Sequence, residues 1–177
     1  MLIVRLFFWS VAVCLLAAVV HIVAILALPA FAPKSATASA YSMLKANTLA
    51  RFTPAPDQSG VFARENPDME ILVCRYDARR APVRLTGPVT GEYWSITVYD
   101  SKGRNRFALN DSYQVFEKID LIIDTRKRDI EASEKTLIIQ DTSATGLVVL
   151  RAFRPFRAYA QSLRASLGEF VCAEMSH

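Results

Sequence analysis

The chain has 177 residues, a length that fits one folded domain with little room for a second. Hydrophobic residues make up 52% of the chain and charged residues 21%, which excludes a disordered polyelectrolyte. The formal net charge of +4 is too small to indicate nucleic-acid binding, and the two histidines, His21 and His177, are too few for many catalytic designs.

The first element in the chain is a long apolar stretch, residues 6–33, without any Asp, Glu, Lys or Arg. A helix needs roughly 20 apolar residues to cross the hydrocarbon core of a bilayer. Residues 1–33 are therefore predicted to form a transmembrane anchor that contacts membrane lipid through residues 7–29. Pro29 is expected to mark the far end of the span, because proline lacks the N–H that continues the hydrogen-bond ladder.

A cleaved secretory signal is the alternative to an anchor, and small-residue cleavage sites occur at residues 36–38 and 38–40. The apolar cores of signal peptides usually have only about 7–15 residues, which favours the anchor. Basic residues on the two sides of the span nearly balance. The short N-terminal region resembles an export signal, and the cysteines suit an oxidising space. We therefore predict a single-pass bacterial inner-membrane protein whose C-terminal domain lies in the periplasm.

Residues 34–68 are predicted to be a linker that contains one short helix. Residues 34–40 are small and polar, whereas residues 41–52 carry apolar side chains at loosely helical spacing. Residues 53–68 hold three prolines and are expected to form an extended connection.

From residue 69 the pattern changes to short strands. The clearest strand is 93–99, in which Trp94, Ile96 and Val98 share one face. A turn at 100–103 should lead into a returning strand at 107–109. Further strands are expected at residues 69–76, 82–85, 119–123, 136–140 and 146–153.

Strands at such short intervals predict an antiparallel β-sandwich or barrel. After Pro155 the apolar side chains recur at helical spacing, at Tyr159, Leu163, Leu167 and Phe170. This pattern predicts a C-terminal helix that packs on the sheet. Residues 69–177 are therefore expected to form one exported domain of mainly β structure with a C-terminal helix.

Three cysteines are present, and Cys14 lies in the predicted anchor. Cys74 and Cys172 could form a disulfide in an exported domain, or they could be two buried free thiols, since sequence does not show whether their Cα atoms come close. No CxxC motif occurs, so neither a zinc site nor a thioredoxin-like motif is predicted. We predict no metal and no cofactor.

A group of polar side chains around the predicted hairpin is the candidate ligand site: Asp100, Arg104, Asn105, Asn110 and Asp111. These residue types could bind a sugar, a phosphate or a metal, but Asp and Asn also cap turns and pair with Arg. Histidine-based catalysis is disfavoured, because His177 is the only histidine of the exported domain and ends the chain.

Basic residues gather in two parts of the sequence. One group contains Arg75, Arg79, Arg80 and Arg84, and the other contains Arg151, Arg154, Arg157 and Arg164. If these side chains converge, they would suit anionic lipid headgroups or acidic envelope polymers. Otherwise they are ordinary surface charges, some of them stacked on aromatic side chains such as Phe153, Phe156 and Tyr159.

Three stretches carry a resemblance to a known family: Cys-Arg-Tyr-Asp at 74–77, Pro-Val-Arg at 82–84 with Gly-Pro at 87–88, and above all residues 93–111. They resemble the bacterial family catalogued as domain of unknown function 1254, in its short, membrane-tethered alphaproteobacterial form. The resemblance implies a jelly-roll-like sandwich in the cell envelope and no particular reaction. Larger relatives add a second domain, numbered 1214, which has no match here, and their Asn-x-Asp-rich segment has none around 59–68.

Two functions follow as expectations. The first is a non-enzymatic envelope protein whose sandwich binds another envelope protein, with a companion that carries the 1214-type domain as the expected partner. The second is an enzyme or binding module that acts on envelope lipid or glycan through the hairpin from Asp100 to Asp111 and its arginines. We predict the first, because no catalytic constellation is recognisable in the sequence.

Overall fold

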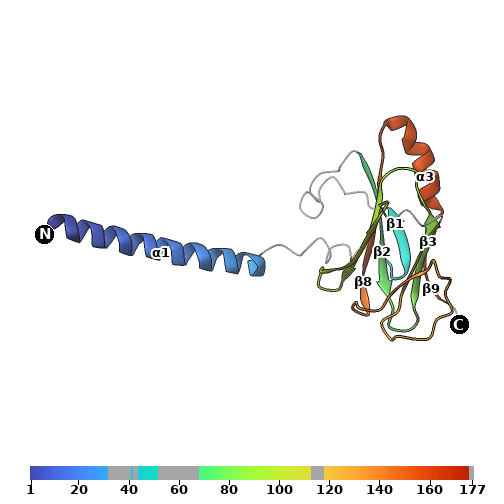
Figure 1. Cartoon of the computed structure of the whole chain (residues 1–177), viewed down its shortest axis with the longest axis horizontal. Helices are drawn as coiled ribbons and strands as arrows, with labels where there is room; N and C mark the ends of the chain where they lie inside the picture. The colour runs from blue at the N-terminus through green and yellow to red at the C-terminus, as the bar shows by residue number, and fades with distance from the viewer. Residues whose placement is uncertain (32–40, 42–43, 52–67, 113–117, 176–177) are drawn as a thin grey trace. The chain divides into compact units, whose positions relative to one another are not determined.

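A computed structural model describes the following parts of the chain: residues 1–31, 41, 44–51, 68–112 and 118–175. The first compact unit is the helix α1 (Leu2–Phe31), shown in blue in Figure 1. Residues Leu2–Leu28 of this helix are long and apolar enough to cross a membrane. The span ends directly before Pro29, where its far end was expected, and α1 itself continues to Phe31.

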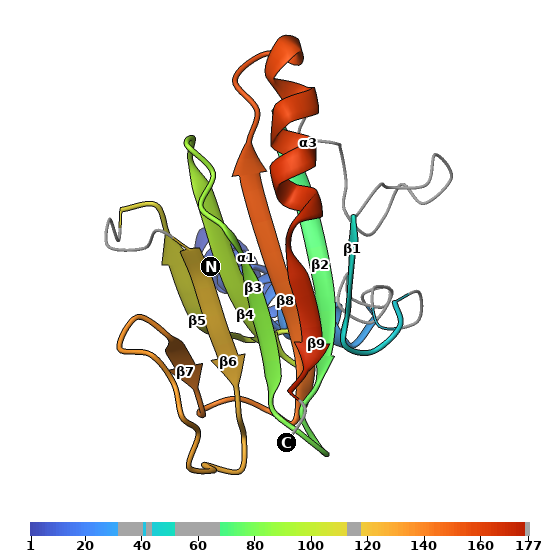
Figure 2. The same ribbon diagram turned by 90° about the vertical axis from the view of Figure 1, so that its right-hand side faces the viewer.

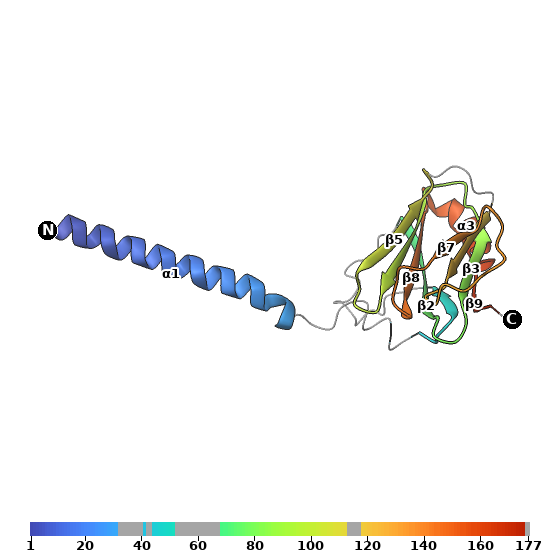
Figure 3. The ribbon, with the colours of Figure 1, turned by 60° about the horizontal axis from the view of Figure 1, so that its bottom comes forward.

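The second compact unit is built around two β-sheets that face each other (Figure 3). Sheet A contains, in spatial order, β1 (Thr48–Arg51), β2 (Met69–Asp77), β8 (Thr145–Phe153), β4 (Trp94–Asp100) and β5 (Asn105–Asn110). Sheet B contains β7 (Leu137–Ile139), β6 (Lys118–Ile123), β3 (Val83–Pro88) and β9 (Val171–Glu174). The predicted two-sheet sandwich is confirmed, with one difference: β7 runs parallel to β6.

The core lies between the sheets and follows the alternation of the strands. In β4 the predicted shared face of Trp94, Ile96 and Val98 points into this core, and all three are buried. The same alternation places Leu72 and Tyr76 of β2 in the core. A period of two is what a strand requires when one of its faces is buried.

The outer face of sheet A carries a second apolar cluster. Val73, Leu147 and Val149 are buried there, and Tyr41 and Leu44 pack against them. The segment that precedes β1 therefore covers part of a sheet face that would otherwise meet solvent.

The helix predicted over residues 41–52 is wrong at its C-terminal end, because residues 48–51 form β1. This strand pairs with β2, and its central pair is Leu49 with Cys74. Asn47 adopts a φ of 55°, which turns the chain from the preceding segment into the strand. Tertiary pairing thus overrides a weak helical spacing in so short a segment.

The C-terminal helix is confirmed as α3 (Ala160–Gly168), preceded by the 3₁₀ turn η1 (Arg157–Tyr159). α3 lies at one end of the sandwich, between the end of β8 and the start of β9 (Figure 2). Leu163 and Leu167 are its buried residues, and they belong to the core. The helix is followed by β9, which the strand pattern did not predict.

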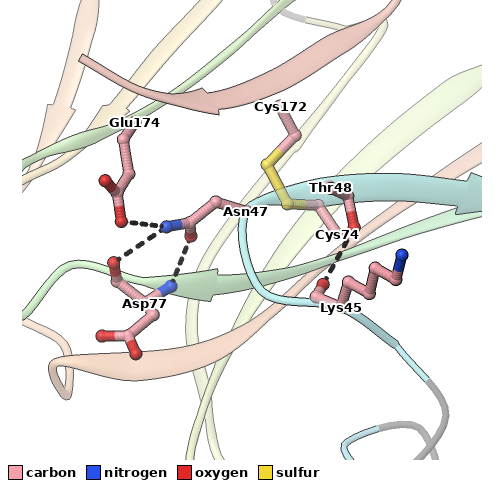
Figure 4. The surroundings of a disulfide bond; sticks show 7 residues. All are labelled: Lys45, Asn47, Thr48, Cys74, Asp77, Cys172 and Glu174. Carbon is pink, nitrogen blue, oxygen red and sulfur yellow. Dashed lines mark hydrogen bonds between the residues drawn. A yellow bond between two sulfur atoms is a disulfide. The ribbon is translucent and has the colours of Figure 1, made fainter. Parts of the chain in front are cut away.

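A disulfide between Cys74 of β2 and Cys172 of β9 joins the two sheets through the core (Figure 4). The Cα atoms of the two residues are 6.4 Å apart, within the range that a disulfide can span. Nearby, the side-chain amide of Asn47 donates to the Asp77 carbonyl oxygen and to Glu174, while its oxygen accepts from the Asp77 N–H. These contacts connect β1, β2 and β9 at the same edge.

Candidate functional site

The predicted hairpin site separates into two places. Asp100 ends β4 at the turn, whereas Asp111 follows β5 and its N–H donates to the carbonyl oxygen of Trp94, at the other end of β4. Six residues of β4 separate these positions, which corresponds to about 20 Å along a strand. The two carboxylates therefore do not form one site.

Asp100 is fully engaged in its own turn. Its side chain is 2% exposed and accepts hydrogen bonds from the N–H groups of Lys102 and Arg104 at 2.9 and 3.0 Å, and from Arg104 Nε at 2.7 Å. Gly103 supplies the positive φ of 76°. Burial opposes ionisation of Asp100, but these donors outweigh it and lower the pKa of the carboxyl. This is the turn-capping role that the sequence left open.

The remaining hairpin candidates line up along β5. Asn105 pairs with Tyr99 at the turn, and Asn110 pairs with Ser95 at the far end. Asp111 is exposed to solvent. Among the five predicted site residues, the structure brings only Asp100, Arg104 and Asn105 together.

A second turn repeats the same arrangement in sheet B. Asp124, fully buried directly after β6, accepts hydrogen bonds from the N–H groups of Arg126 and Arg128 and from the Arg128 guanidinium. In both turns an aspartate pairs with the arginine four residues later. The recurrence supports a structural role for Asp100.

The opposite end of sheet A gathers three arginines around one carboxylate. Glu70 lies on the core-facing side of β2, directly opposite Ala152 of β8, and is 7% exposed. Three arginines approach its carboxylate: Arg164 Nε at 2.9 Å, Arg154 Nη1 at 3.5 Å and Arg51 Nε at 3.8 Å. We call these four residues the Glu70 cluster. Its members come from β1, β2, α3 and the residue after β8.

Two of the sequence-predicted C-terminal arginines, Arg154 and Arg164, thus converge. Arg151 lies on β8 opposite Ile71 and Ser95. The side chain of Arg157 is outside the described residues.

The other predicted basic group does not converge. Arg75 lies on the outer face of sheet A, where its Nη1 donates to the carbonyl oxygens of Tyr41 and Leu44 and its guanidinium lies 5.3 Å from the centroid of the Tyr41 ring. Arg84 forms a bidentate pair with Asp120 on sheet B, with both distances 2.7 Å. The Arg84 guanidinium lowers the pKa of Asp120.

A shallow depression crosses the outer side of β3 and β9. Its larger part has a volume of about 470 Å³ and is lined by Thr86, Gly87, Pro88, Lys118, Glu169 and Val171. A second part of about 240 Å³ shares Thr86 and Val171 and extends along β9 to Met175. We call both parts the β3–β9 groove. Val171, which is 55% exposed, lies at its centre.

The described residues offer no centre for metal or histidine chemistry. Among them no group of three or more His, Cys, Asp or Glu side chains could hold a metal ion. The one described histidine, His21, lies in α1, and His177 is outside the described residues.

Glu70 and Arg51 were not among the residues predicted from the sequence. A usable signal existed: Glu70 has the same strand parity as Leu72, Cys74 and Tyr76, so β2 carries a carboxylate on its apolar face. A charged residue in such a position requires a partner. The partners themselves are distant in sequence, since Arg164 lies 94 residues away.

Comparisons with known proteins show the fold alone. No family model and no curated protein matches the sequence. The structure is similar to the VPA0106 protein from Vibrio parahaemolyticus, with a TM-score of 0.61 and 13% identity over 78% of this chain and 32% of that one. An uncharacterized protein from Burkholderia cenocepacia matches with a TM-score of 0.45 and 12% identity, over 66% and 33% of the two chains. The chain thus spans about a third of the length of either protein.

Proposed function

We propose that the chain is a membrane-anchored protein of the bacterial cell envelope whose β-sandwich is a protein–protein interaction module. In this proposal α1 holds the protein in the inner membrane and the sandwich lies in the periplasm. The apolar span of α1 and the disulfide between the sheets support this location, because disulfides persist in oxidising compartments.

An interaction module agrees with how the buried carboxylates are used. The carboxylates of Asp100 and Asp124 accept hydrogen bonds from donors within their own turns. A general acid or base must instead be within reach of a substrate proton.

The β3–β9 groove is the surface that we assign to the partner, and it is the observation that carries the proposal. It is open to solvent and combines an exposed aliphatic side chain, Val171, with the small side chains of Thr86 and Ala173. Interfaces place apolar contact at the centre and charge at the rim. Lys118 and Glu169 supply charged groups at the edge of the groove.

The partner that we propose is an envelope protein with the 1214-type domain that larger members of family 1254 carry. This assignment rests on the resemblance of residues 93–111 to that family. The fold similarity to a part of the longer VPA0106 chain is compatible with it.

A site-specific crosslink tests the proposal. The full chain with a photoreactive residue at position 171 should, in intact cells, form one reproducible adduct that mass spectrometry identifies as a protein with a 1214-type domain. The matched control carries the same residue at Ile138, an exposed aliphatic side chain on β7 of the same sheet, and should not form this adduct.

Substitution provides the second arm. Val171→Arg should abolish co-purification of the companion from detergent extracts, while Ile138→Arg should preserve it. The location would be contradicted if a reporter that works only in the cytoplasm were active when fused to the C-terminus. A companion that still co-purifies with Val171→Arg would contradict the assignment of the groove.

A further inference from the structure

The Glu70 cluster gathers three guanidiniums around one carboxylate. Three guanidiniums lie within 4 Å of Glu70, which accepts a hydrogen bond of 2.9 Å from Arg164. Asp68 is two residues away, and the N–H of Arg154 donates to its carbonyl oxygen. Three guanidiniums thus share the single carboxylate of Glu70.

Two of these arginines also remain open to solvent. The side chains of Arg164 and Arg51 are 49% and 38% exposed, whereas Glu70 is 8% exposed behind them. Arg164 uses its Nε for Glu70, and its two terminal nitrogens make no hydrogen bond with any described residue. A guanidinium has five N–H donors in a planar fork, so most of its donor capacity is left for a ligand.

The cluster is preorganised by the fold. Arg164 is fixed by α3, whose Leu163 is buried in the core, and Arg51 is the last residue of β1. Glu70 contacts both side chains and so holds them near each other. Positioning donors before a ligand arrives reduces the entropy that binding costs.

Exposed aromatic groups lie at the same end of sheet A. Phe156, two residues after Arg154, is 61% exposed, and its ring centroid lies 6.0 Å from that of Tyr159. Tyr93 is 44% exposed, and its carbonyl oxygen accepts the N–H of Phe153. A ligand held by the arginines would therefore have apolar surface beside it.

We propose that the Glu70 cluster binds a phosphate group, with Phe156 contacting the apolar or sugar part of the molecule that carries it. The tetrahedral oxygens of phosphate accept paired N–H donors from guanidinium forks. The phosphate could belong to a lipid headgroup or to a soluble phosphorylated compound, and the two sources are separated by experiment below.

The first experiment uses inorganic phosphate as the probe. The full chain in neutral detergent should gain several degrees in Tm when chloride is replaced by phosphate at equal ionic strength, because a ligand of the native state stabilises it. Arg164→Gln and Arg51→Gln should lose this gain. Arg79→Gln, which removes an exposed guanidinium paired with Asp77, is the matched control and should retain it.

A charge variant tests the cluster more sharply. Glu70→Gln removes the carboxylate that holds the arginines in place, so the gain in Tm on adding phosphate should be smaller than in the wild type. A merely structural ion-pair cluster would show no gain from phosphate in either protein. Val171→Arg should keep the full phosphate response, which separates this proposal from the one for the β3–β9 groove.

The second experiment identifies the source of the phosphate. A nitroxide label at Phe156→Cys, in a Cys14→Ser background, reports water access in nanodiscs of phosphatidylcholine with or without phosphatidylglycerol. If the label is shielded from water only in discs that contain phosphatidylglycerol, the phosphate belongs to a lipid headgroup. A control label at Ser101→Cys should stay accessible to water in both kinds of disc. An accessible label in both discs assigns a soluble phosphate. No phosphate response in the first experiment, or one that survives both arginine substitutions, overturns the proposal.

Discussion

Asp100 and Glu70 occupy matching positions at opposite ends of sheet A. Each is a buried carboxylate on the core-facing side of a strand, and β8 lies beside both of them, with Gly146 opposite Asp100 and Ala152 opposite Glu70. Asp100 is paired with one arginine from its own turn. Glu70 is approached by three arginines from other elements.

A structural carboxylate and a candidate binding centre differ in where their hydrogen-bond donors come from. A carboxylate whose donors come from the next four residues completes a turn, and its charge is paired within that turn. A carboxylate that collects several guanidiniums from distant elements leaves positive charge at the surface. In the second arrangement only the carboxylate is buried, and the arginine side chains keep part of their surface open to solvent.

The largest effect on the free energy of unfolding is expected from removing the disulfide between the two sheets. Replacing Cys74 and Cys172 together by alanine removes a crosslink between residues 98 apart. The chain-entropy account predicts a loss of about 4–5 kcal/mol in the free energy of unfolding. Urea denaturation of the full chain in neutral detergent, followed by the fluorescence of buried Trp94, measures this loss. An unchanged midpoint would show that the bridge contributes nothing to stability.

The next largest effect is expected from Glu70→Gln. The substitution keeps the size of the side chain but leaves three guanidiniums without their shared counter-charge. Because the guanidiniums left behind are partly exposed, the cost should be about 1–2 kcal/mol, less than for a fully buried ion pair. The same urea measurement, without phosphate, should give a lower midpoint with an unchanged slope. A midpoint equal to that of the wild type would mean that the arginines do not depend on Glu70.

Asp100→Asn should have a smaller effect that depends on pH. Because the folded pKa of Asp100 lies below its unfolded value of 3.8, its charge stabilises the fold above that pH and ceases to do so as pH falls further. The Tm of the variant should be several degrees lower at pH 6, and it should fall less steeply than the wild-type Tm below pH 3.8. Parallel curves would contradict an ionised, turn-bound Asp100.

The smallest effect concerns Tyr41, which covers the outer face of sheet A. Burial raises the pKa of Tyr41 to about 12 from the ordinary 10.0, so its contribution to stability is complete below pH 10 and is lost as pH rises to about 12. Tyr41→Phe should change neutral stability by about 0.5 kcal/mol or less. In an absorbance titration at high pH, the variant should show one fewer tyrosine with a raised pKa than the wild type. If the late step is undiminished, Tyr41 is not buried against the sheet.

Much of the fold was predictable because its signals are local. An uncharged run long enough to cross a bilayer gave α1, strict alternation gave β4, and helical spacing gave α3. β1 and β9 are only four residues each and exist through pairing with β2 and β3, so their own sequences carry little signal. The Glu70 cluster is non-local in the same way, since only the folded chain brings Arg51 and Arg164 to one carboxylate.

The disulfide also sets how the protein would carry mechanical load. A pull on the N-terminal segment reaches the sandwich first at the contacts of Arg75 with Tyr41 and Leu44, and next at β1. The neighbouring strand β2 is covalently tied to β9, so tension beyond β1 passes into both sheets at once. Stretching should therefore peel away the first strand together with Arg51, and the bridge should then stop further unravelling of β2 at Cys74.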